Sequence, residues 1–310
     1  MRFFSPKSLG EAFEIIDNPD SQVLLASGMT HLLRFYPQLP DGLPPQTNAL
    51  LHVGDIQSLA EAKEEGSRFS LGSTLRLCDL SADSTLARYL SGVWDAARQT
   101  STPQIRNRRS LGGELAWGSY HSPLITALLS FDAQVRVRRS VRSRKASAPF
   151  EENIPLEKFY IDSIERKNAN AQTHFCRKAD LHSGDLILKA FLENQDFKRP
   201  GHFSFFKALS PKISTENPGV VVAVSGIIQN ATLTRARIAA SGVWMSTLRE
   251  EIPLEGVKLK PSVFLEKLYQ WCERYPLESY RRSGPSSKEL GLIIFGLLKD
   301  GFSQMMGSSS

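Results

Sequence analysis

Two glycine-bearing turns contain the residues of this sequence that could do chemistry. The first glycine turn is SGMTHLL, residues 27–33, and the second glycine turn is TPQIRNRRSLGGELAWGS, residues 102–119. Glycine accepts positive φ and lets the backbone approach a ligand closely, so successive N–H groups can form a nest for an anion. In the second turn the hydroxyl of Ser110 could donate to a phosphate, and three arginines add positive potential. The pattern predicts either a phosphate site or two ordinary tight turns.

Other common catalytic and cofactor motifs are absent from the sequence. It has no GxGxxG and no GxxxxGK[ST], so a Rossmann or P-loop nucleotide site is not supported, and it has no HExxH and no GxSxG. The six histidines are scattered, without helical metal-ligand spacing. Cys78, Cys176 and Cys272 are too far apart for a zinc site and too few for a four-thiolate iron–sulfur cluster. We therefore expect no catalytic residue and no metal site.

Length and composition indicate two ordinary globular domains. The chain has 310 residues, of which 41% are hydrophobic and 23% are charged, and this composition excludes wholesale disorder. The longest apolar stretches, such as 292–298, are too short to span a bilayer. The N-terminal residues lack the apolar core and the small-residue cleavage site of a secretory signal. We therefore expect no membrane association and a reducing, cytoplasmic location.

One basic segment, residues 136–145, accounts for the net charge of +6. It has six basic residues and no acidic one, so the other 300 residues sum to zero charge. A nucleic-acid-binding protein more often spreads Lys and Arg over a face, with aromatic residues interleaved, so we expect no nucleic-acid partner. We interpret the segment as a solvated hairpin tip or loop, and contact with an acidic partner protein is the alternative. Its basic residues are Arg136, Arg138, Arg139, Arg142, Arg144 and Lys145.

The elements that must position the turns are helices and strands of the first 196 residues. Ser8 and Glu11 have capping-box spacing, and the apolar residues after them predict a helix over 9–16. Ser122, followed by Pro123, predicts the start of a buried helix. We further expect a helix over 86–97, loops over 100–120 and 139–180, and strands over 22–26, 49–54, 68–73, 133–137 and 184–192.

The pattern changes after the polar stretch ENQDFKRPG, which we take as the domain boundary, giving domains 1–196 and 197–310. Strands are expected over 202–209, 219–228 and 231–243, followed by a helix from Pro261 and another from Ser286 to Gly301. Alternating helices and strands, then antiparallel strands, then helices predict two different α+β domains.

Several segments, taken in order, resemble one family. SGMTHLL resembles AGGTDLL, and TPQIRNRRSLGGELA resembles SPQIRNxGTIGGNLA. VGDIQSL, FSLGSTLRLCDL, ALLSFDAQVRV and LHSGDLI resemble ISxIxEL, IxIGAxTTxxDL, PALLALDAEVVL and LxPGELI, and LTRARIAASGV resembles xIxxARIAxGGV. These are motifs of the flavoprotein subunit of molybdenum hydroxylases, the xanthine and carbon monoxide dehydrogenase group. The resemblance covers nearly the whole chain.

The resemblance implies an α+β fold with a vanillyl-alcohol-oxidase, or PCMH-type, FAD-binding domain and a smaller α+β C-terminal domain. It implies FAD as cofactor, with the pyrophosphate held by the two glycine turns. It also implies two partners, a molybdenum-cofactor large subunit and a [2Fe–2S] small subunit, with NAD as a possible electron acceptor. Because the flavin does the redox chemistry, this chain needs no acid or base of its own.

Matching the motifs residue by residue places the cofactor-binding positions in the two turns. Gln104, Arg106 and Asn107 match the SPQIRN stretch, as binding residues or as loop architecture. Trp117 and Tyr120 could stack near the isoalloxazine ring or face a partner subunit. The cofactor-binding positions are Ser27, Gly28, Met29, Thr30, His31, Leu32, Ser110, Leu111, Gly112, Gly113, Glu114 and Ser119.

Five places depart from the family pattern. Met29 replaces a glycine and resists positive φ. His31 replaces an aspartate, Glu114 an asparagine and Pro123 an aspartate, and SPKISTENPGVVV has no aspartate where RRxxxDIA has one. The carboxylate of Glu114 would repel a pyrophosphate unless it turns outward or pairs with Arg108 or Arg109. Two hypotheses follow: an electron-transfer subunit that binds FAD through backbone contacts, or a structural or assembly subunit whose flavin site is degenerate.

Overall fold

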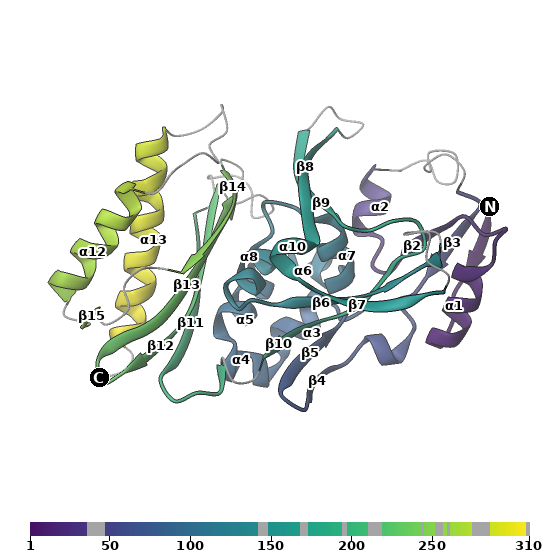
Figure 1. Ribbon diagram of the computed structural model, residues 1–310. Helices are drawn as coiled ribbons and strands as arrows, with labels where there is room; N and C mark the ends of the chain where they lie inside the picture. Colours follow the sequence, from purple (N-terminus) through teal and green to yellow (C-terminus); the bar gives the residue numbers. More distant parts are fainter. Residues whose placement is uncertain are drawn as a thin grey trace. The chain divides into compact units, whose positions relative to one another are not determined.

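The chain forms two compact units, and each is described by itself (Figure 1). The first unit comprises residues 1–79, 103–119 and 132–193, and the second comprises 80–102, 120–131 and 194–310. The predicted boundary at residue 196 stays a prediction, although the second unit also includes two segments that precede it. The computed structural model describes residues 1–35, 47–141, 148–167, 173–193, 197–209, 219–242, 245–251, 257–258, 261–274 and 286–307.

A three-stranded parallel sheet begins the first unit, in the order β1 (Arg2–Phe4), β3 (Ala49–His52), β2 (Val23–Ala26). Helix α1 (Leu9–Asp17) covers it, with Ala12 and Ile16 packed against Leu51. The capping prediction is confirmed, because the Oγ of Ser8 accepts a hydrogen bond from the N–H of Glu11 at 3.3 Å. The first glycine turn therefore leaves the end of β2, at one edge of this sheet.

A five-stranded antiparallel sheet completes the first unit. Its central strand is β10, which pairs with β5 through Ala190 opposite Leu71 and with β6 through Ala190 opposite Val135. The strand predicted over 184–192 is therefore confirmed, and it lies between two strands that precede it in the chain. The strand order is β4 (Ala62–Glu65), β5 (Arg68–Gly72), β10 (Leu186–Glu193), β6 (Gln134–Arg139) and β7 (Phe150–Pro155).

The two stretches predicted as loops contain regular elements, so these predictions were wrong. Most of these elements have only four to eight residues, which is too short for apolar periodicity to be recognised. The expected helix over 86–97 is also interrupted, because Leu90 leaves helical geometry. The elements in the two stretches are α6 (Pro103–Arg106), α7 (Leu111–Trp117), β7, α10 (Leu156–Phe159), β8 (Tyr160–Lys167) and β9 (Thr173–Ala179). The interrupted helix consists of α4 (Ser84–Tyr89) and α5 (Ser91–Gln99). Shorter pieces are α2 (Thr30–Phe35), η1 (Gln57–Leu59) and α3 (Leu77–Ala82).

The second unit is an antiparallel sheet with helices on both faces (Figure 1). Alternate valines of β12 pack with Phe264 and Leu298 on one face. On the other face Ser204 accepts a hydrogen bond from the N–H of Gly92 at 3.0 Å. The strands are β11 (His202–Leu209), β12 (Val220–Gln229), β13 (Thr232–Gly242), β14 (Met245–Glu251) and β15 (Val257–Lys258), and the helices are α5, α8 (Pro123–Ser130), α12 (Pro261–Arg274) and α13 (Ser287–Gly307).

The last helix passes Gly301 and ends at Gly307, so the predicted end was wrong. A Cβ on Gly301 would lie 2.2 Å from the ring of Phe205. The glycine therefore allows α13 to approach β11 and does not stop the helix.

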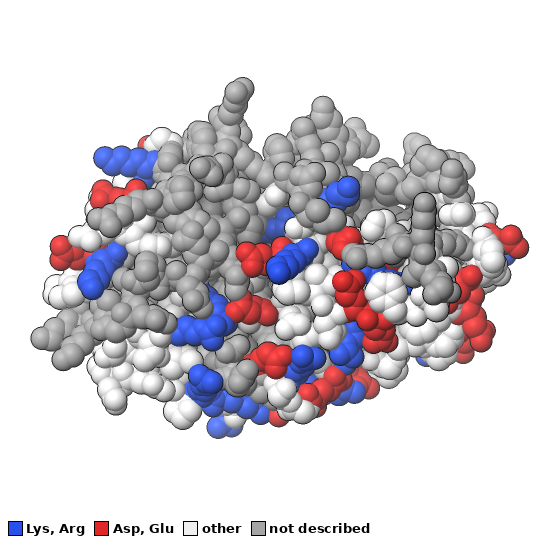
Figure 2. All heavy atoms as spheres, in the orientation of Figure 1, with Lys and Arg blue, Asp and Glu red and all other residues white. Residues whose placement is uncertain are grey.

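The basic segment is not a solvated tip over its first half. Arg138 pairs with Asp17, and the fully buried Arg139 places Nη1 2.9 Å from the carboxylate of Asp185 and Nε 3.0 Å from that of Glu152. Figure 2 shows the described Lys and Arg interspersed with Asp and Glu on the visible face. Three of the six charges, Arg136, Arg138 and Arg139, thus belong to β6, and each has an acidic partner. The other three, Arg142, Arg144 and Lys145, lie outside the described residues.

Candidate functional site

The two glycine turns come together within the first unit. A Cβ on Gly28 would lie 1.9 Å from the carbonyl oxygen of Arg108 and 3.0 Å from the Cα of Arg109. Only glycine allows this approach without moving the backbone. The next residue, Met29, has φ 57°. Met29 therefore adopts the left-handed conformation at a cost, at a position where the resembling motif has glycine.

The second turn is fixed by short contacts with residues 73–77. The N–H of Gly112 donates to the carbonyl oxygen of Ser73 at 2.6 Å, and a Cβ on Gly112 would lie 2.8 Å from the Cβ of Ser73. Ser110 precedes α7, and its Oγ accepts a hydrogen bond from the N–H of Gly113 at 3.2 Å. These two N–H groups are thus already bonded within the protein, while the Ser110 hydroxyl keeps its own hydrogen to donate.

A cavity of about 250 Å³, here called the turn cavity, lies between the two turns. Its wall includes apolar residues of β2 and the backbone of both turns. Ser73 and Thr74 also line it, and both side chains are buried. Within the part of the chain that the structure describes, neither hydroxyl has a hydrogen-bond partner. The lining residues are 23–27, Val53, Ser73, Thr74, Ser110, Gly112, Gly113, Ala116 and 181–187.

The segment 181–187 forms one wall of the turn cavity and is held by a buried carboxylate. Asp185 accepts hydrogen bonds from the N–H of Ser140 at 2.9 Å and the N–H of His182 at 3.1 Å, besides its ion pair with Arg139. This segment and residues 73–74 belong to the motifs LHSGDLI and FSLGSTLRLCDL, for which no binding role was predicted. Their polar residues beside a Gly, in GST and HSGD, were the available signal.

Of the predicted cofactor-binding positions, the structure brings Ser27, Ser110, Gly112 and Gly113 to the turn cavity. Leu111 and Glu114 are buried, and Ser119 forms a β-bridge with Cys176. The positions that do not line this cavity are Gly28, Met29, Thr30, His31, Leu32, Leu111, Glu114 and Ser119. Gln104 and Asn107 are exposed, and Tyr120 belongs to the second unit.

Glu114 pairs with Arg109, one of the alternatives that the sequence left open. Its Oε2 lies 3.5 Å from Nη1 of Arg109 and 3.7 Å from Nε2 of His31. The ring of His31 stacks on Trp117, with centroids 4.5 Å apart and planes 9° apart. Two of the departures from the family pattern, His31 and Glu114, therefore contact each other.

The hairpin of β8 and β9 packs against the C-terminal end of α7. The hydroxyl of Tyr160 donates to the carbonyl oxygen of Leu115 at 3.0 Å, and burial raises the pKa of this phenol. Arg177 donates from Nη1 to the carbonyl oxygen of Ser119 at 2.7 Å. Gly118, with φ 67°, ends α7 in the left-handed conformation. The second turn is thus fixed at both ends of its helix.

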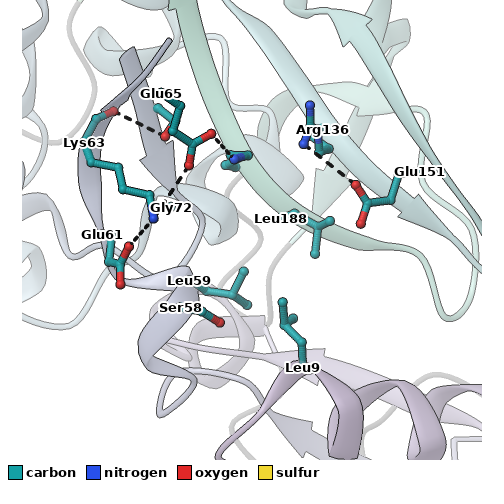
Figure 3. Close-up of a pocket in the computed structure, with 12 residues that line it drawn as sticks. Leu9, Ser58, Leu59, Glu61, Lys63, Glu65, Gly72, Arg136, Glu151 and Leu188 are labelled. Atoms are coloured by element: carbon teal, nitrogen blue, oxygen red, sulfur yellow. Dashed lines mark hydrogen bonds and ion pairs between the residues drawn. The ribbon is translucent and has the colours of Figure 1, made fainter. Parts of the chain in front are cut away.

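A second cavity, of about 180 Å³, lies on the five-stranded sheet and is here called the sheet cavity (Figure 3). Its charged residues pair with one another. Lys63 lies between Glu61, at 2.6 Å, and Glu65, at 3.7 Å, while Lys189 pairs with Glu65. Arg136 lies 3.9 Å from Glu151. Because these charges are already matched, the turn cavity is the better candidate for a cofactor.

No helix among the described residues is long and apolar enough to cross a membrane. No group of three or more His, Cys, Asp or Glu side chains among them could hold a metal ion.

Comparison with known proteins gives one family for the first part of the chain. The family model described as the FAD binding domain in molybdopterin dehydrogenase matches residues 1–191. The medium subunit of nicotine 6-hydroxylase from Paenarthrobacter nicotinovorans is 27% identical over 145 residues, 47% of this chain and 49% of that protein. The FAD-binding subunit of xanthine dehydrogenase from Escherichia coli O157:H7 is 30% identical over 194 residues, 59% and 60% of the two chains. The matched part thus spans about half to three fifths of these relatives.

Solved structures share the fold over nearly the whole chain. A chain of carbon monoxide dehydrogenase from Hydrogenophaga pseudoflava superposes with a TM-score of 0.75 at 18% identity, covering 98% of this chain and 96% of that one. A chain of quinoline 2-oxidoreductase from Pseudomonas putida 86 gives a TM-score of 0.71 at 18% identity, covering 97% and 93%. The predicted α+β fold is confirmed.

Proposed function

Because the chain belongs to the family of FAD-binding domains in molybdopterin dehydrogenases, we propose that it is the electron-transfer subunit of a molybdenum hydroxylase and that the turn cavity holds the FAD pyrophosphate. FAD is the cofactor of this family and of this chain. The observation that carries the site assignment is the contact of the two glycine turns, where Gly28 leaves no room for a Cβ against the backbone of Arg108.

The polar groups of the turn cavity suit a phosphate-bearing ligand. Ser73 and Thr74 provide two buried hydroxyls that no described residue satisfies, and buried hydroxyls without partners are costly unless a ligand bonds them. Ser110 adds a hydroxyl with a free hydrogen. We propose that these three side chains donate to the pyrophosphate. The segment 181–187, which the contacts of Asp185 hold in place, would orient the cofactor and exclude water from it.

When bound, FAD would supply the electron-transfer chemistry, and the proposed path runs from a [2Fe–2S] small subunit through FAD to NAD or another acceptor. The partners in this proposal are that subunit and a molybdenum-cofactor large subunit. Support comes from the relatives, which are the medium subunit of nicotine 6-hydroxylase and the FAD-binding subunit of xanthine dehydrogenase. The proposal asks no acid–base step of this chain, and it keeps the cytoplasm as the expected compartment.

A structural or assembly subunit with a degenerate flavin site is the second candidate. The observation that favours it is the left-handed backbone of Met29, since a chain selected for this turn would more easily use glycine. Under this alternative the complex would need the fold of the chain but not its flavin.

The test is a titration of the purified protein with FAD, followed by visible absorbance. Gly113→Glu adds a carboxylate at the cavity wall, where a Cβ would meet only the Oγ of Ser110 at 3.1 Å. Gly10→Glu, at an open position of α1 with no atom nearer than 3.9 Å, is the matched control. We expect shifted flavin bands in the wild type and in Gly10→Glu and their loss in Gly113→Glu, with all three proteins folded.

Two outcomes would count against the proposal. Stoichiometric flavin in Gly113→Glu would mean that the pyrophosphate binds elsewhere. A wild-type protein that takes up no FAD, even with its partner subunits present, would favour the assembly role.

A further inference from the structure

We infer that His31, Arg109 and Glu114 form a coupled charge cluster that joins the two glycine turns and tunes how tightly FAD is retained. This inference rests on the function proposed above. His31 lies on α2, within the first turn, and Glu114 lies on α7, within the second. The Oε2 of Glu114 is 3.7 Å from the imidazole and 3.5 Å from the guanidinium of Arg109. The cluster therefore connects the two segments that border the turn cavity.

Burial makes the three charges depend on one another. The side chains of Glu114, Arg109 and His31 are 2%, 12% and 18% exposed. A carboxylate that is almost fully buried is strongly unfavourable unless cations or hydrogen bonds compensate it. Here the two nearby basic groups come from different segments of the chain. Removing or reversing one of them changes the electrostatic energy of the others, which is the condition for coupling.

The imidazole of His31 contacts two side chains from the same helix. Trp117 is three residues after Glu114 on α7, so both side chains lie on one face of that helix. The indole stacks on the imidazole at 4.5 Å between centroids. A carboxylate and an indole face both attract an imidazolium. The charged form of His31 therefore has two stabilising partners, the indole of Trp117 against its ring and the carboxylate of Glu114 near its Nε2.

Protonation of His31 sets the net charge of the cluster. Arg109 and Glu114 sum to zero, so the cluster is neutral with a neutral imidazole and carries +1 with an imidazolium. A positive cluster beside the turn cavity attracts the anionic pyrophosphate. Since histidine is the side chain that ordinarily titrates between pH 5 and 8, FAD should bind more tightly at the acidic end of this range.

The other groups that face the cluster do not change this sign. On β8, Tyr160 interacts electrostatically with Glu114, and burial raises the pKa of its phenol, so it stays neutral at these pH values. On β9, Arg177 and Cys176 interact with Tyr160, and the guanidinium of Arg177 keeps its charge. Trp117 does not titrate. Among the groups named here that face the cluster, His31 is the one whose charge ordinarily varies between pH 6 and 8. His182 lines the turn cavity but is not part of the cluster, so its own contribution is measured separately with His182→Gln.

A double-mutant cycle tests the coupling. His31→Asp places a second carboxylate beside Glu114 and removes one of the two basic groups near it. Adding Glu114→Gln leaves one carboxylate, now on α2 instead of α7, so the balance with Arg109 is restored. We expect His31→Asp to lower the melting temperature of the flavin-free protein and to weaken FAD binding about tenfold or more. The double variant should recover most of both losses, to within about threefold of the wild-type affinity.

The tuning is tested by measuring the FAD dissociation constant at pH 6 and pH 8. We expect the wild type to bind about three- to tenfold more tightly at pH 6, as one unit charge near the pyrophosphate allows. His31→Gln should remove this difference. His202→Gln, in the second unit, is the matched control and should keep it.

The outcomes separate this inference from the function on which it rests. Additive losses in the double variant would overturn the coupling, and a pH difference that survives His31→Gln would overturn the tuning. A wild-type protein that binds no FAD would refute the proposed function and the tuning together. The melting temperatures of the flavin-free proteins would still decide the coupling, because they need no cofactor.

Discussion

The turn cavity and the sheet cavity lie in the same unit and are of similar size, about 250 and 180 Å³, but their polar groups are used differently. In the sheet cavity, charged residues on neighbouring strands are matched in pairs near the surface. In the turn cavity, the ion pairs are buried behind the wall, and two hydroxyls on the wall have no partner among the described residues. The difference teaches that side chains paired with one another stabilise the folded surface and need no ligand. Buried hydroxyls without a partner, on a wall held by buried ion pairs, indicate a binding site.

The largest expected difference is in the free energy of unfolding lost when an arginine is removed, Arg139 behind the wall of the turn cavity or Arg136 in the sheet cavity. Arg139→Leu leaves the buried carboxylate of Asp185 without its cation, and breaking such a pair costs about 3–5 kcal/mol. Arg136→Leu removes a half-exposed pair with Glu151 and costs about 0–1 kcal/mol. Urea unfolding followed by circular dichroism measures both free energies. Equal losses would show that the buried network does not support the turn cavity.

A smaller difference, in FAD affinity, is expected when a hydroxyl is removed from the turn cavity or from the sheet cavity. Thr74→Val removes a hydroxyl that bonds no described residue, so the fold should lose little stability. If that hydroxyl donates to the pyrophosphate, FAD binding weakens by about 1.5–3 kcal/mol, or about ten- to a hundredfold.

Ser70→Ala in the sheet cavity should give the opposite result. It removes a hydrogen bond from Ser70 to the carbonyl oxygen of Lys63, 3.3 Å long, which is worth about 1 kcal/mol of stability, and leaves FAD affinity unchanged. The two variants are compared by thermal unfolding and flavin titration. A Thr74→Val protein with full FAD affinity would remove this hydroxyl from the proposed site.

The smallest expected effects concern two residues with left-handed backbone. Met29, beside the turn cavity, has φ 57°, and Gly66, between the strands β4 and β5 of the sheet cavity, has φ 61°. Met29→Gly should stabilise the protein by about 1 kcal/mol, because relief of the strained φ exceeds the entropy cost of glycine. Gly66→Ala should destabilise it by about 1 kcal/mol, since no contact compensates the strain. Shifts of the urea midpoint in the same direction would contradict this assignment.

The sequence predicts long periodic elements and motif-bearing turns well. The capped helix after Ser8, the buried helix after Ser122 and the strand β12 follow from periodicity and capping. The contact of the two turns follows only from the family motifs, since residues 28 and 108 are far apart in sequence. Periodicity does not reveal the short helices around Gly112, because four to seven residues make too few turns.

The polar part of the site is the least predictable from sequence. Local composition describes residues 136–145 as a basic run, whereas β6 buries Arg139 against an acid 46 residues later. Likewise, His31 and Glu114 look like two independent losses in a linear comparison, and only the fold shows that they contact each other. Pairing of distant charges depends on tertiary packing, which no local pattern in the sequence encodes.

The position of β10 has a consequence for synthesis of the chain. Its residues pair with Gly72 of β5 on one side and with Arg138 of β6 on the other. Both strands are synthesised before β10, which ends at residue 193, so they lack this partner until β10 is made. Until then β5 and β6 each present an open edge, which is a template for pairing with other chains. Closing contacts of such long sequence separation is slow. The nascent first unit is therefore most prone to aggregation just before residue 193 leaves the ribosome.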